Sequence, residues 1–79
     1  MKKIQRLPQA FGKIIAEERA RKNLSQEQLA EAIEATNVYI CLLETGQRQP
    51  SLNATILIAN ALGIHPSELL NKVTALLDT

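Results

Sequence analysis

The sequence is poor in the residues on which several protein classes depend. Its 79 residues include one cysteine, Cys41, and one histidine, His65, so an internal disulfide and a metal site built from several histidines are both excluded. The only aromatic side chains are Phe11 and Tyr39. No hydrophobic run approaches the length of a membrane span, and polar residues follow Met1 too closely for a signal peptide. We expect one small domain in the reducing cytoplasm, with no membrane partner.

Catalytic groups are equally scarce. With three glycines in all, the chain has no glycine-rich loop to hold phosphates. No basic residue lies near Cys41 in the sequence, so we expect a packed thiol rather than a nucleophile. Glu17 with Glu18, and Glu31 with Glu34, are expected to be solvated faces of helices. The sequence therefore predicts no enzyme activity, no cofactor and no metal ion.

Basic residues are few and unevenly distributed. The net charge is +1, and every Lys and Arg except Arg48 and Lys72 precedes Asn23. A footprint for nucleic acid depends on where cations cluster rather than on their total number. Residues 1–7 carry charge without a periodic pattern, and we expect a flexible basic arm there, ahead of a single domain over residues 8–79.

Leucine, isoleucine and alanine, by contrast, are abundant and recur at helical spacing. Hydrophobic residues make up 46% of the chain, and neither a strand pattern nor a repeat is present. Residues that start and end helices divide the chain into five segments. The sequence therefore predicts an all-α fold, with helices at 8–22, 26–33, between Thr36 and Gly46, from Ser51 to Leu62, and at about 66–77.

Two of these segments carry more detailed expectations. Ser25–Gln28 has the pattern of a capping box, in which serine and glutamine each satisfy a backbone N–H of the other. The pattern of the fourth helix predicts an inward face made of Leu52, Ile56, Ala59 and Leu62.

The short second and third helices, joined by a tight turn at about residues 25–45, have the helix-turn-helix arrangement. The series that carries the resemblance is Phe11-Gly12, Leu24–Ala30, Tyr39-Ile40, Leu43–Gly46, Pro50–Leu52, Ala59–Ile64 and Glu68–Leu70. On this ordered series, about residues 10 to 70 resemble the Cro/cI, Xre-like family of phage repressors, a compact five-helix fold that binds DNA. The Tyr39-Ile40 pair and the short length also resemble the controller proteins of restriction-modification systems.

The resemblance implies how DNA would be bound. The third helix, starting at Thr36, would enter the major groove. The positions implied to contact DNA are Gln26, Thr36, Asn37, Val38, Tyr39, Leu42 and Arg48. Among these, the amide of Gln26 is implied to hold a phosphate, Asn37 to read adenine, and Arg48 to lie against the DNA backbone. The resemblance further implies a buried salt bridge between Arg19 and Glu44.

Some residues depart from the family pattern and leave a second interpretation open. Glu34 stands in the turn where the family often has glycine, which costs about 1 kcal/mol if the backbone there is left-handed. Cys41 and Leu42 make the reading face unusually apolar. The family resemblance as a whole still favours a DNA-binding transcriptional regulator. Such a regulator could also have RNA polymerase as a partner. The alternative is a protein-interaction module such as an antitoxin, whose apolar third helix binds a toxin.

The last helix predicts self-association. The resemblance implies that Leu69 and Leu70 are buried in the domain, whereas Val73, Leu76 and Leu77 lie beyond its footprint. Apolar side chains without cover form an association surface. We therefore expect a two-fold homodimer through these three residues, which would set two third helices about 34 Å apart on a palindromic operator.

Overall fold

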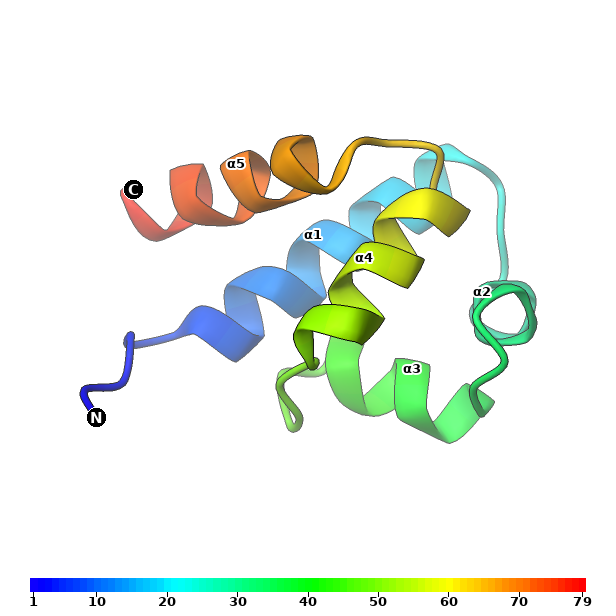
Figure 1. Ribbon diagram of the computed structural model, residues 1–79, viewed down its shortest axis with the longest axis horizontal. Coiled ribbons are helices and arrows are strands. Elements are labelled where there is room, and N and C mark those ends of the chain that lie inside the picture. Colours follow the sequence, from blue (N-terminus) through cyan, green and yellow to red (C-terminus); the bar gives the residue numbers. More distant parts are fainter.

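The computed structural model describes residues 1–79 and contains helices but no strand. The helices are α1 (Leu7–Arg21), α2 (Gln26–Ala32), α3 (Asn37–Glu44), α4 (Leu52–Ala61) and α5 (Pro66–Leu77). Figure 1 shows α1 crossing the molecule between α5 and α3, and α1 packs against both. The predicted all-α, five-helix fold is thus confirmed, and no helix has the length and hydrophobicity to span a bilayer.

Side-chain caps fix where the last four helices begin. Each starts after a residue whose side chain accepts a hydrogen bond from a backbone N–H of the first turn. The bonds are Gln28 N to Ser25 Oγ (3.0 Å), Tyr39 N to Thr36 Oγ1 (3.1 Å), Ala54 N to Ser51 Oγ (3.0 Å) and Ser67 N to His65 Nδ1 (3.1 Å). The capping box is complete, since Ser25 N donates to Gln28 Oε1 at 2.8 Å.

Two of the short turns between helices contain a residue other than glycine in the left-handed conformation. Asn23, with φ of 58°, follows α1, and Glu34, with φ of 57°, lies between α2 and α3. Asparagine adopts this conformation more readily than other residues with a Cβ, whereas glutamate has no such advantage. The strain expected at Glu34 is therefore present in the turn that joins the two helices of the motif.

Replacing Glu34 with glycine is expected to stabilise the fold by about 0.5–1 kcal/mol. Glycine removes the clash of a Cβ in the left-handed region, and only part of this gain is offset by the greater entropy of the unfolded chain. Urea denaturation measures the effect. Glu31→Gly, the same change at an exposed helical position of α2, should instead destabilise by about 1 kcal/mol. Equal losses in both variants would contradict strain at Glu34.

The core lies among the five helices, with α1 packed against α3 and α5. Its fully buried large side chains come from every helix or its end, and they are Ile15, Leu29, Ile40, Leu43, Ile58, Leu62, Leu69 and Val73. At Gly12 α1 runs so close to the end of α3 that an added Cβ would lie 2.7 Å from the carbonyl oxygen of Glu44. This close approach fixes the position of α3 on the rest of the domain.

The predicted inward face of α4 is partly wrong. Ala59 and Leu62 are buried, but Leu52 is 73% exposed and Ile56 is 40% exposed. The helix is rotated so that Ala54, Thr55 and Ile58 face inward instead. Thr55 can be buried there because its hydroxyl donates to the Ser51 carbonyl oxygen at 2.8 Å, which satisfies the polar group locally.

Glu18 is also not the solvated residue that was expected, since it is only 4% exposed. Its carboxylate lies 3.1 Å from Arg21 Nη1, one turn along α1, and 3.9 Å from Lys72 Nζ on α5. Burial of a charge requires partners of opposite sign. The packing of α5 against α1 supplies the second of these partners.

Candidate nucleic-acid interface

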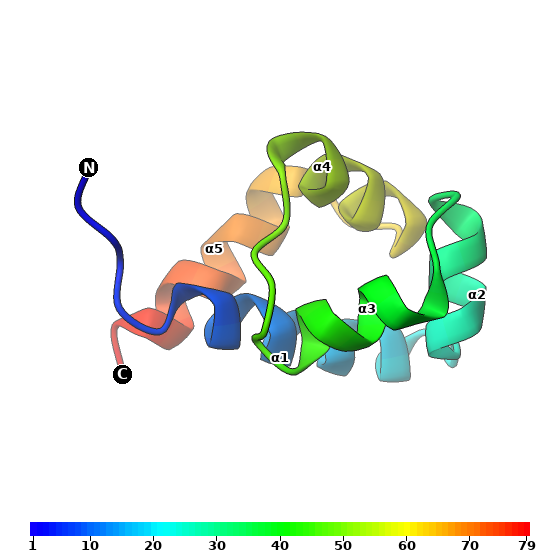
Figure 2. The same cartoon turned by 90° about the horizontal axis from the view of Figure 1, so that it is seen from below.

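Helices α2 and α3 form a helix-turn-helix with α3 on the outside. Figure 2, which views the molecule from below, shows α3 lying across the near side, with α2 at one end. In the turn, Ala35 N donates to Ala30 O at 2.8 Å, closing the end of α2. Thr36, the exposed cap of α3, then sets the start of the third helix.

The side chains of α3 are sorted into an inner and an outer face. Ile40 and Leu43 are fully buried and anchor the helix to the core. On the other side Asn37 and Val38 are exposed, and Val38 leaves 68% of its surface free. Leu42 is half-buried beside them. The first turn of α3 thus presents polar and apolar groups to whatever binds this side of the molecule.

Thr45 and Gln47, both exposed on this side, were not identified from the sequence, and Cys41, which was placed on the reading face, is more accessible than expected. Cys41 was expected to be packed, but its thiol is free and exposed, because the buried face of α3 runs through Ile40 and Leu43 instead. Thr45 follows the helix, and its hydroxyl donates to the Cys41 carbonyl oxygen at 2.9 Å. The side chain of Gln47 in turn donates to this hydroxyl, also at 2.9 Å. The placement of Cys41 on the reading face thus agrees with the structure, and only the expectation of a packed thiol was wrong.

A hydrogen-bonded cluster joins α1, α2 and α3 behind this face. Arg19 contacts both carboxylate oxygens of Glu44, with Nε to Oε2 at 2.7 Å and Nη2 to Oε1 at 3.0 Å. A third donor, Nη1, bonds the Leu24 carbonyl oxygen at 2.8 Å. The side chain of Glu44 is 7% exposed and that of Arg19 is 19% exposed. The hydrogen bond and charge of Glu44 raise the pKa of Arg19 above its ordinary value despite burial, so the guanidinium stays charged.

Gln26, expected to hold a phosphate, belongs to the same cluster. Its Nε2 donates to Glu44 Oε1 at 2.9 Å. The residue is the first of α2 and remains half-buried. The side chain therefore has a defined orientation at the start of the helix, and its amide keeps one N–H for a further acceptor.

Arg48 and Tyr39, both expected to contact DNA, lie together. The guanidinium carbon of Arg48 is 5.8 Å from the centroid of the Tyr39 ring. The ring is half-buried and packs against the hydrophobic core, whereas Arg48 is exposed. The α3–α4 loop thus carries its cation next to the first turn of α3.

The cations of the first third of the chain do not all remain free. Arg19 and Arg21 are both held in ion pairs with glutamates. Between Asn23 and Asn71, a range that includes the whole helix-turn-helix, Arg48 is the only Lys or Arg. Arg48 is therefore the one cation that the helix-turn-helix and the loop after it contribute.

The residues expected at the dimer interface are more buried in the domain than was predicted. Val73 is 1% exposed and belongs to the core, so it has no surface left for a partner. It is buried because α5 packs on α1 farther along its length than expected. Leu76 and Leu77 are half-buried against the same core. Leu70, which was expected to be buried, is 45% exposed.

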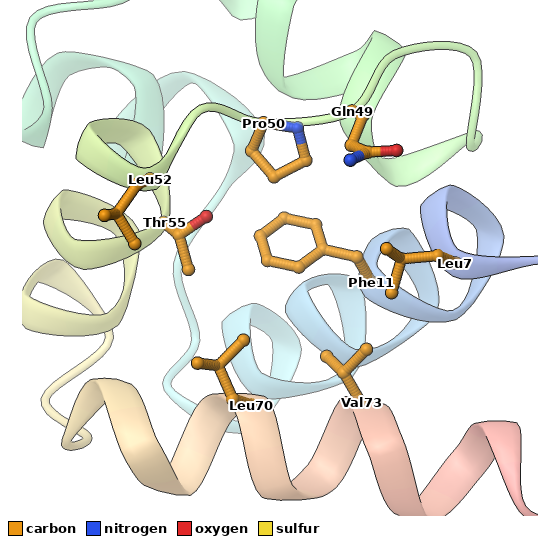
Figure 3. A pocket seen from close by; sticks show the side chains of 8 residues that line it. All are labelled: Leu7, Phe11, Gln49, Pro50, Leu52, Thr55, Leu70 and Val73. Carbon is orange, nitrogen blue, oxygen red and sulfur yellow. The ribbon is translucent and has the colours of Figure 1, made fainter. Parts of the chain in front are cut away.

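Exposed apolar side chains gather instead where α4 meets α5. Leu52, Ile56 and Leu70 form what we call the α4–α5 patch. A pocket of about 250 Å³ opens beside it, and Leu52 and Leu70 are part of its lining. Figure 3 shows these two leucines on one side of the pocket and Leu7 on the other, with Phe11 between them.

A protein-family model and a known protein each match more than half of the chain. The family model described as helix-turn-helix matches residues 15–69. The control protein C.BamHI of Bacillus amyloliquefaciens is 38% identical over 65 residues, which cover 81% of this chain and 80% of that protein.

Solved structures are similar over most of the chain. The restriction-modification controller protein C.AhdI from Aeromonas hydrophila has a TM-score of 0.76 at 40% identity, over 78% of this chain and 94% of that one. The clp gene regulator ClgR from Corynebacterium glutamicum has a TM-score of 0.87 at 26% identity, over 91% of this chain and 77% of that one.

Proposed function

Because the chain belongs to the helix-turn-helix family of DNA-binding transcriptional regulators, we propose that it binds a palindromic DNA operator sequence-specifically as a homodimer. Two of its relatives are control proteins, one of them named for restriction-modification, so genes of such a system are the proposed targets. Occupying an operator would block access of RNA polymerase to the promoter.

The observation that carries this proposal is the outer face of α3. Its first turn offers Asn37 and Val38 to the solvent, while Ile40, Leu43 and the Arg19–Glu44 pair hold the helix in place behind them. An asparagine side chain can make two hydrogen bonds to adenine, and a valine can pack on the methyl group of thymine. A rigid helix that presents these groups suits the major groove.

Contacts to the DNA backbone are assigned to residues on both sides of α3. Arg48 is exposed and free of any carboxylate partner. Gln26 has an N–H available at the start of α2, and Thr36 lies next to the groove-facing turn. Such contacts supply affinity and register, whereas the base contacts supply specificity.

The proposed dimer contact is the α4–α5 patch rather than the end of α5. No charged residue occurs between Arg48 and Glu68, so this face can meet its own copy across a two-fold axis without like charges opposing each other. Leu76 and Leu77, by contrast, are partly covered by their own core and line a depression that also holds Arg6 and Lys13. The pocket beside Leu52 and Leu70 offers a recess for a side chain of the partner.

Salt dependence tests whether the phosphates are bound as proposed. The logarithm of affinity should fall linearly with the logarithm of salt concentration, with a slope of about −0.9 per phosphate neutralised. Arg48→Ala should make this slope shallower by about one unit for each subunit that uses Arg48. Lys13→Ala, an exposed cation on α1 near Leu76 and Leu77, is the control and should leave the slope unchanged. An Arg48→Ala slope equal to that of the parent would remove Arg48 from the interface.

A protein partner for α3 is the second candidate function. It is favoured by the exposure of Val38 and Cys41 on a helix whose outer face carries no charge. Complete absence of salt-dependent binding to any duplex would support this candidate and contradict the proposal above.

A further inference from the structure

Tyr39 and Arg48 form a cation–π pair beside the first turn of α3. Tyr39 is the third residue of α3, and its ring is anchored against the core. Arg48 lies nine positions farther along, in the loop before α4, with its guanidinium carbon 5.8 Å from the ring centroid. A guanidinium within about 6 Å of a ring centroid is attracted by the negative face of the ring.

The stacking orients Arg48 without using its hydrogen-bond donors. A carboxylate partner would occupy the N–H groups along the edge of the guanidinium, whereas an aromatic ring contacts only its face. The pairs formed by Arg19 and Arg21 with glutamates illustrate the first case. Arg48 therefore has a restricted position while its donors stay available for an anion.

This restriction matters because the helix-turn-helix and the loop after it contribute no cation other than Arg48. It is the only Lys or Arg between Asn23 and Asn71, and it sits in an exposed loop where a long side chain would otherwise sample many rotamers. A side chain already held near its bound position loses less entropy when it binds a phosphate.

We propose that Tyr39 is a positioning residue, which acts on DNA through Arg48 by holding the guanidinium beside the first turn of α3 with its donors free for a backbone phosphate. This inference rests on the proposed function. It assigns Tyr39 a different role from a direct contact, because the hydroxyl of the ring is not needed for it.

A double-mutant cycle on a DNA duplex separates the two roles. Tyr39→Phe keeps the ring and should bind like the parent. Tyr39→Leu keeps an apolar side chain without a ring and should bind about two- to five-fold more weakly, the size expected of an exposed cation–π contact. In an Arg48→Ala background, Tyr39→Leu should cause no further loss. A loss that persists in that background, or an equal loss in Tyr39→Phe, would overturn the positioning role.

An NMR measurement on the free protein distinguishes failure of the positioning role from failure of DNA binding. In the free protein, the ring current of Tyr39 should shift the NMR signals of the Arg48 side chain, and Tyr39→Leu but not Tyr39→Phe should abolish the shift. If the shift is present and the parent binds no duplex, the proposed function fails and the positioning role falls with it. If the parent binds DNA and the shift is absent, only the positioning role is overturned.

Arg48→Lys keeps the charge but not the planar group, and should behave like Tyr39→Leu.

Discussion

Replacing Glu44 with alanine is expected to lower the free energy of unfolding by about 3–5 kcal/mol. The change removes both hydrogen bonds that Arg19 makes to the carboxylate and also the partner of Gln26. A largely buried guanidinium is then left with the Leu24 carbonyl oxygen alone. Domains of this size shift their melting temperature by about 4–8 °C per kcal/mol, so a thermal melt should show a large decrease. A shift within 2 °C or so of the parent would contradict a structural role for the pair.

A companion variant tests whether the unpaired charge is the cause. When Arg19→Met is added to Glu44→Ala, no charge is stranded, and part of the lost stability should return. Glu31→Ala, which removes an exposed carboxylate from α2, serves as the control and should change stability by no more than about 0.5 kcal/mol. If the double variant is less stable than Glu44→Ala alone, the loss arises from packing rather than from the stranded guanidinium.

Leu70→Asp is expected to convert a dimer into a folded monomer that binds its operator about 10²–10⁴-fold more weakly. Leu70 lies in the uncharged α4–α5 patch, where an aspartate would face its own copy across the two-fold axis. Separated subunits lose the gain in effective concentration that comes from joining two half-site contacts. Sedimentation equilibrium measures the assembly, and titration of a labelled duplex measures the affinity.

Neighbouring substitutions make the dimer test specific. Asn71→Asp introduces the same charge at the next, exposed position of α5 and should leave the dimer intact. Ile56→Lys, on α4, should separate the subunits as Leu70→Asp does. A dimer that survives both Leu70→Asp and Ile56→Lys would place the interface elsewhere on the molecule, and a parent that is monomeric at high micromolar concentration would contradict the homodimer.

The helices and their order followed from the sequence because their boundaries are set locally. Ser25, Thr36, Ser51 and His65 each cap a helix through a backbone N–H two or three residues away. Interactions of such short range are visible in the order of residues along the chain.

Features that depend on contacts between helices were harder to predict. Glu18 is buried because Lys72 approaches from α5, and Gln26 meets a carboxylate 18 residues away. The rotation of α4 depends on Thr55, a polar residue whose hydroxyl donates to the carbonyl oxygen of the helix cap Ser51. A prediction from apolar periodicity alone therefore gave the wrong inward face for α4.

The candidate site was predictable only in part for the same reason. The outer position of Asn37 and Val38 follows from helical spacing relative to Ile40 and Leu43. The Arg19–Glu44 pair was implied by the family resemblance and not by spacing, since 25 residues separate its members. The exposure of Leu70 and the burial of Val73 depend on how far along α5 the contact with α1 extends, which the pattern of leucines does not encode.

Selection of bound sites from a random duplex library tests the central claim most directly. We expect recovery of a two-fold symmetric sequence whose half-sites are about one turn of DNA apart, or about 34 Å from centre to centre. The same selection with Asn37→Ala should relax the preference at one base pair in each half-site, at a cost of about 1–3 kcal/mol. Recovery of duplexes with no shared sequence, or none retained above the background of the library, would contradict a sequence-specific regulator.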